Sequence, residues 1–255
     1  MKLTLAALLT LTLALGATAA GPDQRVYELR TYTAAPGKFD ALAARMKAHS
    51  IQYLKAHAIT PHGFFTPVDN KAGEMILVVS HESEAARKAN WEAFRADPAY
   101  TQIQRDTDKD GKLIAKQSTL VLTTTDYSPD ISQLKAGDAD RIFELRTYTA
   151  TAGNLDRLNA RFRDHTVKLF EKYGMTNVVY WNVAKGEKDA DKMLVYLLAH
   201  PSEAAMKKAF NEFRVDPAWT SAMKASEQAG GGPLTEAKGG VVSKVLKATD
   251  FSPMK

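Results

Sequence analysis

The stretch RVYELRTYT at residues 25–33 returns almost unchanged as RIFELRTYT at residues 141–149. Copies separated by this much chain indicate a duplicated domain, because the units of a solenoid recur at roughly 20–50 residues. Identical positions continue through both copies, and their offset changes only where loops are expected. The chain of 255 residues is therefore predicted to contain a first repeat at 21–129, a linker at 130–140 and a second repeat at 141–255.

Both copies have the same predicted order of elements. An alternating, aromatic-rich strand is followed by an amphipathic helix, a short aromatic strand and a nearly unbroken apolar strand. A second helix can begin after Ser83 or Ser202, which are favourable N-cap residues, and a last strand closes the copy. The predicted strands span 26–33, 62–67, 75–80 and about 118–125 in the first copy, and 142–149, 178–183, 193–199 and 241–248 in the second.

The order β-α-β-β-α-β is that of a ferredoxin-like unit, an antiparallel sheet with both helices on one face. The other face of such a sheet must be covered, and the second copy of the same chain can cover it. The predicted fold class is therefore α+β, with two ferredoxin-like repeats packed sheet to sheet as a pseudo-twofold α/β barrel.

Alternation along the first strand separates two sets of side chains, because successive residues point to opposite faces of a sheet. Tyr27, Leu29 and Thr31 form a set that suits contact with the helices. The polar set is expected to face the barrel interior, and its members are Glu28, Arg30 and Tyr32 in the first copy and Glu144, Arg146 and Tyr148 in the second.

Charged groups in a barrel interior are costly to desolvate unless they are paired or hydrated. Two interpretations of the polar set are open. The Glu and Arg side chains form ion pairs across the pseudo-twofold axis, or they line a ligand pocket. In a pocket, two arginines would favour a small anionic or carbonyl-bearing ligand.

His49 and His165 occupy equivalent positions on the apolar stripe of the first helix in each copy. A histidine there is either a core residue with satisfied hydrogen bonds or a group that contacts a ligand or transfers a proton. No histidine pair has metal-ligand spacing on a helix face, and DTDKDGKL at 106–113 matches only the opening of a calcium loop. No metal and no other cofactor is therefore predicted.

Residues 1–20, MKLTLAALLTLTLALGATAA, combine an early lysine, an apolar run and a small-residue ending. This pattern is typical of a secretory signal peptide, cleaved here after Ala19 or Ala20. The run is too short for a membrane span and no later stretch resembles one, so stable membrane insertion is not expected. Export to the periplasm is the predicted location, and a chain without cysteine folds there without disulfides.

The formal net charge of +5 becomes +4 when Lys2 is removed with the signal peptide. The charges are interspersed and no basic stripe accompanies them, so no nucleic-acid partner is expected. Barrel repeats often expose strand edges, which would permit a homo-oligomer.

The repeated motifs resemble those of the NIPSNAP family. The resemblance rests on YELRTYTAAPGKFDAL (27–42), the histidine late in the first helix and SEAARKANWEAFRADPAY (83–100), each with its counterpart in the second copy. It implies the dimeric α/β-barrel superfamily, which also contains small monooxygenases, haem-degrading enzymes and chlorite dismutase-like proteins. The family pattern is matched by Glu28, Arg30, Tyr32, Gly37, His49, Asp97 and Pro98, and by Glu144, Arg146, Tyr148, Gly153, His165, Asp216 and Pro217.

The resemblance implies no general catalytic activity, so two functions are open. The first is an exported small-molecule-binding or interaction protein. The alternative is an enzyme of the monooxygenase or isomerase kind, either cofactor-independent or haem-using, that acts inside the barrel. In that enzyme Arg30 and Arg146 would stabilise an oxyanion, while His49 and His165 would act as acid–base groups. A pocket that opens onto Arg30, Tyr32 and His49 would favour the enzyme.

Overall fold

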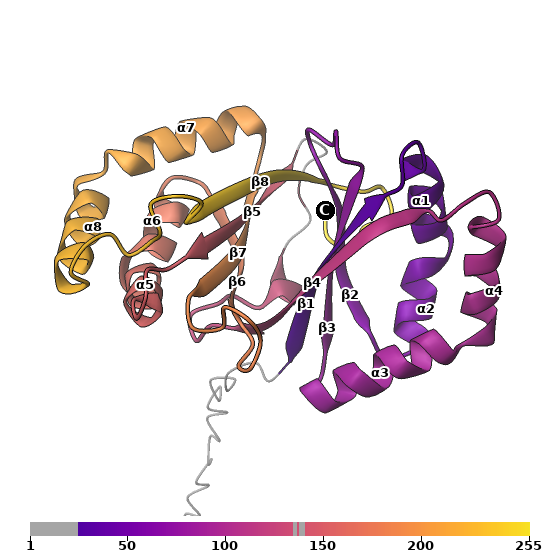
Figure 1. The fold of residues 1–255 in the computed structure, drawn as a ribbon. Helices are drawn as coiled ribbons and strands as arrows, with labels where there is room; N and C mark the ends of the chain where they lie inside the picture. Colours follow the sequence, from indigo (N-terminus) through magenta and orange to yellow (C-terminus); the bar gives the residue numbers. More distant parts are fainter. Residues whose placement is uncertain (1–24, 135–136, 138–140) are drawn as a thin grey trace, which may run out of the picture.

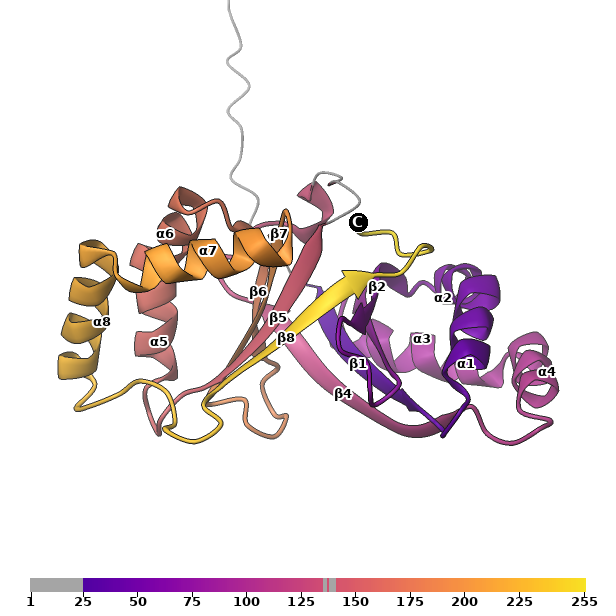
Figure 2. The same ribbon diagram turned by 90° about the horizontal axis from the view of Figure 1, so that it is seen from above.

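The computed structural model describes residues 25–134, 137 and 141–255, in which the strands form one closed antiparallel barrel (Figures 1 and 2). Their order around the barrel is β1-β3-β2-β8-β5-β7-β6-β4. The strands are β1 (Val26–Ala34), β2 (Thr60–Pro67), β3 (Glu74–His81), β4 (Ile114–Thr124), β5 (Ile142–Thr149), β6 (Thr176–Val183), β7 (Met193–His200) and β8 (Val241–Ala248). The predicted fold class is confirmed, with four strands from each repeat.

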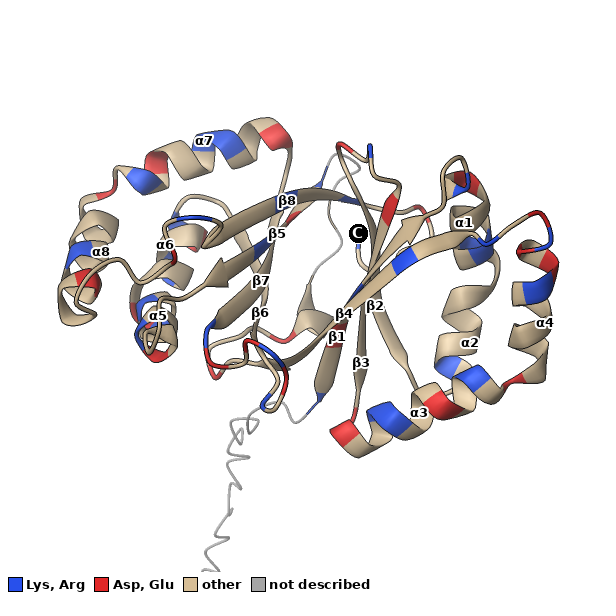
Figure 3. Ribbon diagram, in the orientation of Figure 1, with Lys and Arg blue, Asp and Glu red and all other residues tan. Residues whose placement is uncertain are grey.

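The helices lie outside the barrel, those of the first repeat on one side and those of the second on the opposite side (Figure 1). Acidic and basic residues are interspersed along them (Figure 3). Within the described ranges, no helix has the length and apolar character to cross a membrane. The helices are α1 (Phe39–Arg45), α2 (Ile51–Ala56), α3 (Glu84–Ala96), α4 (Pro98–Thr107), α5 (Leu155–Arg161), α6 (Val167–Lys172), α7 (Glu203–Arg214) and α8 (Pro217–Ala229).

The helix starts expected from the sequence are formed by side-chain caps. Ser83 Oγ accepts a hydrogen bond from the Ala86 amide at 3.1 Å, and Ser202 caps α7 in the same way. Asp97 and Asp216 cap α4 and α8, each followed by proline in the first turn. The expected signal peptide, residues 1–20, lies outside the described residues, as does part of the expected linker.

The barrel interior is an apolar core shared by both repeats. Phe65 of β2 and Phe143 of β5 are fully buried and pack edge to face, with ring centroids 5.0 Å apart. Tyr27 and Leu29 belong to the same core, as does Trp181 of the second repeat. Burial favours this apolar set, and polar side chains on the same face, such as His62 and Ser80, hydrogen-bond to each other.

The expected direction of the two strand faces is therefore wrong. Tyr27 and Leu29 point into the barrel, whereas Glu28 and Tyr32 face the helices of their own repeat. The predicted alternation of side chains is correct. Both faces of the sheet are covered, one by the other repeat and one by helices, so the alternation did not show which face points into the barrel. Polar side chains can be accommodated under the helices because α3 supplies partners for them.

Replacing Phe65 with alanine is expected to lower the free energy of unfolding by roughly 3–5 kcal/mol, because the cavity it leaves lies in the core between the repeats. Both repeats should still unfold in one transition, measured by urea denaturation with circular dichroism and tryptophan fluorescence.

The control is Val242→Ala, at a side chain that is 51% exposed, which should change the free energy of unfolding by less than about 0.5 kcal/mol. Separate transitions for the two repeats in the wild type would contradict a shared core.

Candidate functional site

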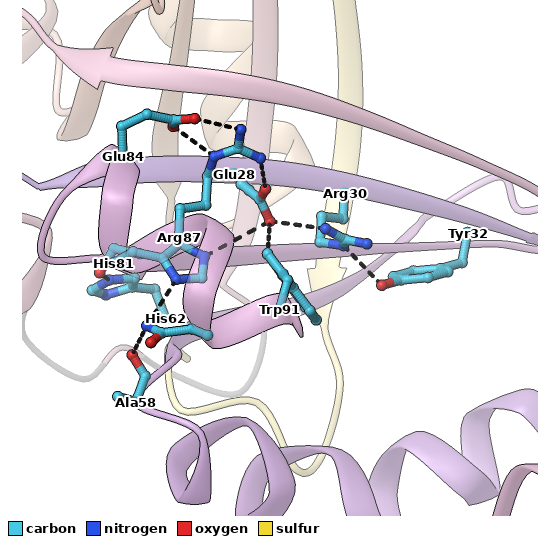
Figure 4. A network of polar contacts seen from close by, with 11 residues as sticks. Glu28, Arg30, Tyr32, Ala58, His62, His81, Glu84, Arg87 and Trp91 are labelled. Atoms are coloured by element: carbon cyan, nitrogen blue, oxygen red, sulfur yellow. Dashed lines mark hydrogen bonds and ion pairs between the residues drawn. The ribbon is translucent and has the colours of Figure 1, made fainter. Parts of the chain in front are cut away.

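Glu28 is the centre of a polar network between β1 and α3 (Figure 4). Its carboxylate is 1% exposed and accepts hydrogen bonds from Arg30 Nη1 at 2.8 Å and Arg87 Nη1 at 2.9 Å. Trp91 Nε1 donates a third hydrogen bond at 2.7 Å, and His81 Nε2 lies 3.8 Å from the same carboxylate. Three elements are thus held together by one buried acid.

The charge of Glu28 is stabilised by these neighbours. Burial by itself raises the pKa of this carboxyl, but the contacts with His81, Arg30 and Arg87 outweigh burial and lower the pKa to about 2. The ion pairs expected across the pseudo-twofold axis are instead formed within one strand, since Glu28 and Arg30 both belong to β1. Their role is to join the strand to its own helices.

Arg30 is held in a fixed position but keeps an unused donor. Its Nε donates to the Tyr32 hydroxyl at 2.9 Å, and its guanidinium carbon lies 4.0 Å from the centroid of the Trp91 ring. Among the described residues, Arg30 Nη2 has no hydrogen-bond partner, and Figure 4 shows no contact from it. Because the Tyr32 oxygen accepts from Arg30, its own proton remains available for donation.

A cavity of about 270 Å³ lies beside this donor pair, between the sheet of the first repeat and its helices. Arg30 and Tyr32 line it, whereas Glu28 and His49 do not. Three exposed side chains, Arg95, Gln104 and Gln117, form its mouth. The buried wall is mainly apolar and includes Met46, Ser50, Leu54, Leu77, Trp91 and Phe94.

A π-helical turn explains why His49 is absent from the cavity. In the first repeat the turn spans Met46–Ser50 and joins α1 to α2. Its wider winding shifts the buried stripe by one residue, so that Ser50 and Leu54 are buried instead of His49 and Tyr53. The expected position of His49 on the apolar stripe is therefore wrong.

The second repeat has the same turn at Phe162–Thr166, and there His165 is exposed. It lies in a separate groove between α5 and α8, next to Arg161. The two histidines are thus brought neither to the cavity nor to each other. In the described part of the chain no group of three His, Cys, Asp or Glu residues could hold a metal ion.

The equivalent of the cavity in the second repeat is filled by larger side chains. Tyr196 faces Arg146 across β5 and β7, in the register that Leu77 has with Arg30 across β1 and β3. Three further positions in the same region differ between the repeats: Met46 corresponds to Phe162, Leu54 to Phe170 and Gln117 to Val241. At three of these positions the second repeat has an aromatic ring that the first repeat lacks. The rings of Tyr196, Phe162 and Phe170 are all buried.

Arg146, unlike Arg30, has a partner for every guanidinium nitrogen. Nη1 pairs with Glu144, Nε donates to the Tyr196 hydroxyl at 2.9 Å and Nη2 donates to the Tyr148 hydroxyl at 3.0 Å. Ser243 Oγ donates a hydrogen bond to the carboxylate of Glu144. The two copies of the polar set therefore differ: one retains free donors beside a cavity, and the other is a closed structural network.

Sequence reasoning identified Arg30 and Tyr32 but missed the residues around them. Ser50, Trp91 and Arg95 line the cavity and had not been singled out as site residues. The sequence did contain an indication of the cavity at positions where the two copies differ, such as Leu77 and its larger counterpart Tyr196. Positions that are identical in both copies gave no such indication.

The family model named NIPSNAP matches residues 27–129 and again residues 143–253. The chain belongs to the NIPSNAP family. Both NIPSNAP repeats contribute to the barrel, and in the described residues the cavity beside the first-strand arginine belongs to the first repeat. Among curated proteins, no sequence matches this chain.

Solved structures share the architecture of the two NIPSNAP repeats. A monooxygenase candidate from Lactobacillus acidophilus NCFM covers 88% of this chain and 94% of its own, with a TM-score of 0.56 and 8% identity. An anthrone oxidase-like protein covers 91% of this chain and 95% of its own, with a TM-score of 0.55 and 13% identity. A NIPSNAP family protein from Agrobacterium tumefaciens strain C58 covers 42% of this chain and 94% of its own, with a TM-score of 0.38 and 21% identity. At these identities the first two likenesses establish the fold alone.

Glu28 should make stability depend on acid pH. Its pKa is about 2 in the folded state against an ordinary 4.5, so its contribution is complete above pH 4.5 and is lost as pH falls through about 2. The contribution is about 3 kcal/mol. Glu28→Gln should therefore be much less stable than the wild type at neutral pH, and the difference should shrink between pH 4.5 and 2. Urea unfolding at a series of pH values measures this.

The matched control is Glu92→Gln, an exposed glutamate on α3, the helix whose Trp91 contacts Glu28. It should follow the wild type at every pH. A difference between wild type and Glu28→Gln that stays constant over the acid range would show that the Glu28 charge does not stabilise the fold.

Proposed function

We propose that the chain binds a small molecule in the cavity of its first NIPSNAP repeat, through an anionic or carbonyl group of the ligand. One observation carries the proposal. Arg30 Nη2 and the Tyr32 hydroxyl are donors without an acceptor at the wall of a cavity, whereas the second repeat satisfies the same arginine completely. A part-buried arginine donor, held in place at the wall of a largely apolar cavity, is the kind of polar group that orients a small-molecule ligand.

The rest of the cavity suits the body of such a ligand. Leu54, Leu77 and Phe94 provide an apolar wall that would exclude water from the ligand's middle. The guanidinium of Arg30 is fixed by Glu28 and by the ring of Trp91, so little side-chain entropy would be lost on binding. A carboxylate or carbonyl oxygen would accept hydrogen bonds from both free donors.

An enzymatic role is the second candidate. The same two donors could stabilise an enolate or another oxyanion in a cofactor-independent reaction. An acid–base enzyme also needs a group that takes up a proton, and neither a histidine nor a carboxylate lines the cavity within the described chain. His49 and His165, expected in that role, lie outside it, and binding is the better supported function.

Haem, the cofactor alternative, fits the cavity poorly. The axial ligand is a histidine or a cysteine thiolate in most haem enzymes, and the described lining offers neither. The sulfur of Met46 already accepts a hydrogen bond from Ser50 at 2.9 Å. No haem chemistry is therefore derived for this site.

Export to the periplasm belongs to the same proposal and is supported by the signal-peptide pattern of residues 1–20. Protein purified from periplasmic extract without added ligand should carry a co-purifying small molecule in native mass spectrometry. The mass should be absent from a Leu77→Tyr variant, in which the cavity is filled, and present in an Arg146→Lys variant.

Leu77→Tyr should abolish ligand binding by filling the cavity. The fold should tolerate the change, because Tyr196 occupies the equivalent position and is completely buried. Isothermal titration with benzoate, phenylacetate and terephthalate measures the loss, and an unchanged melting temperature shows that the variant is folded. Wild-type affinity in a folded Leu77→Tyr protein would overturn the proposed site.

Arg30→Lys should weaken binding about tenfold or more, because lysine keeps the charge near Glu28 but loses the Nη2 donor. Arg146→Lys is the matched variant in the second repeat and should leave ligand affinity unchanged. Equal effects of the two substitutions would place the ligand elsewhere.

A further inference from the structure

The mouth of the cavity carries polar side chains that its buried wall lacks. Arg95 of α3, Gln104 of α4 and Gln117 of β4 are exposed and line the opening. Arg95 has no hydrogen-bond or ion-pair partner among the described residues. A cation at the mouth therefore lines the same cavity as the donor pair of Arg30 and Tyr32, together with an apolar wall.

The three polar side chains of the mouth have different counterparts in the second repeat. Arg214, the counterpart of Arg95, donates to Asn211 Oδ1 at 3.3 Å and lies over the ring of Phe210. The counterparts of Gln104 and Gln117 are Met223 and Val241, which offer no comparable donors. The repeat that has the cavity is thus also the repeat that has polar groups around its entrance.

The charges of the side chains that line the cavity favour a ligand with an acidic group at the end nearer the mouth. Within the described chain, no acidic side chain lines the cavity, while Arg30 and Arg95 both do. Glu28 balances the charge of Arg30, so the inner donors can hold either a carbonyl or a carboxylate. Arg95 has no such counter-charge, so a ligand that reaches the mouth is favoured if it is anionic there.

We propose that the ligand is a small dicarboxylate with an apolar middle, one acidic end at Arg30 and Tyr32 and the other at Arg95. This inference rests on the function proposed above and adds the second acidic end. The apolar span between the two ends contacts Leu54, Leu77 and Phe94. The amides of Gln104 and Gln117 provide further donors at the outer carboxylate.

The test compares each diacid with its own monomethyl ester, which keeps the length and shape but loses one charge. Adipate, pimelate, suberate and terephthalate are titrated into the full mature chain by calorimetry. At least one diacid should bind about fivefold more tightly than its ester, a preference expected of an exposed ion pair. The preference should decline as salt is added, because the mouth is open to solvent.

Arg95→Gln should abolish the preference for the diacid, so that the diacid and its monoester bind with equal affinity. Lys88→Gln is the control, since it removes one exposed positive charge from the same helix without touching the cavity. It should preserve the preference for the diacid.

The outcomes distinguish the dicarboxylate proposal from the small-molecule binding on which it rests. If acids bind in a manner that depends on Arg30, but every diacid and its ester bind equally, the dicarboxylate class is wrong and the site stands. The same holds if Arg95→Gln leaves the preference intact. If no member of the series binds the wild type, the proposed site and its ligand class are both wrong.

Discussion

The structure depends on a barrel with an apolar centre, closed by strands from two repeats. Once β2 pairs with β8 and β4 with β6, apolar side chains from both repeats pack together at that centre, as at Phe65 and Phe143. A charged pair on the interior face, Lys244 with Glu74, is partly exposed, whereas the more deeply buried Glu28 points to the helices, where two arginines are its partners. The polar set of the first strand thereby lies beneath the helices and not at the barrel centre.

Glu28 makes that outward position stable. A buried carboxylate with a single partner would be a liability, but this one accepts from two arginines and an indole. The network joins β1 to α3 and fixes the plane of Arg30. The energy that holds the strand to its helix thus also orients the donor that remains free in the cavity.

Duplication provides a comparison inside one molecule. The two repeats share their backbone plan, the π-helical turn and the Glu-Arg-Tyr set, yet only the first is open beside its arginine. The difference arises from a few side-chain volumes, chiefly Leu77 against Tyr196, and from the hydroxyl that Tyr196 adds as an acceptor. In the second copy, by contrast, every guanidinium nitrogen of Arg146 has an acceptor within its own repeat.

The sequence by itself determined the duplication, the strand alternation, the element order and the helix caps, because each of these depends on residues close together in the chain. It also pointed to Arg30 and Tyr32. Tertiary structure decided which strand face turned inward, since both faces of the sheet are buried and periodicity cannot distinguish them. Tertiary structure also decided where His49 lies, because its position depends on a π-helical turn for which the sequence has no strong local pattern. Tertiary structure also decided the cavity, because it is the volume left when side chains of β1, β3, β4, α2, α3, α4 and the π-helical turn pack around Arg30.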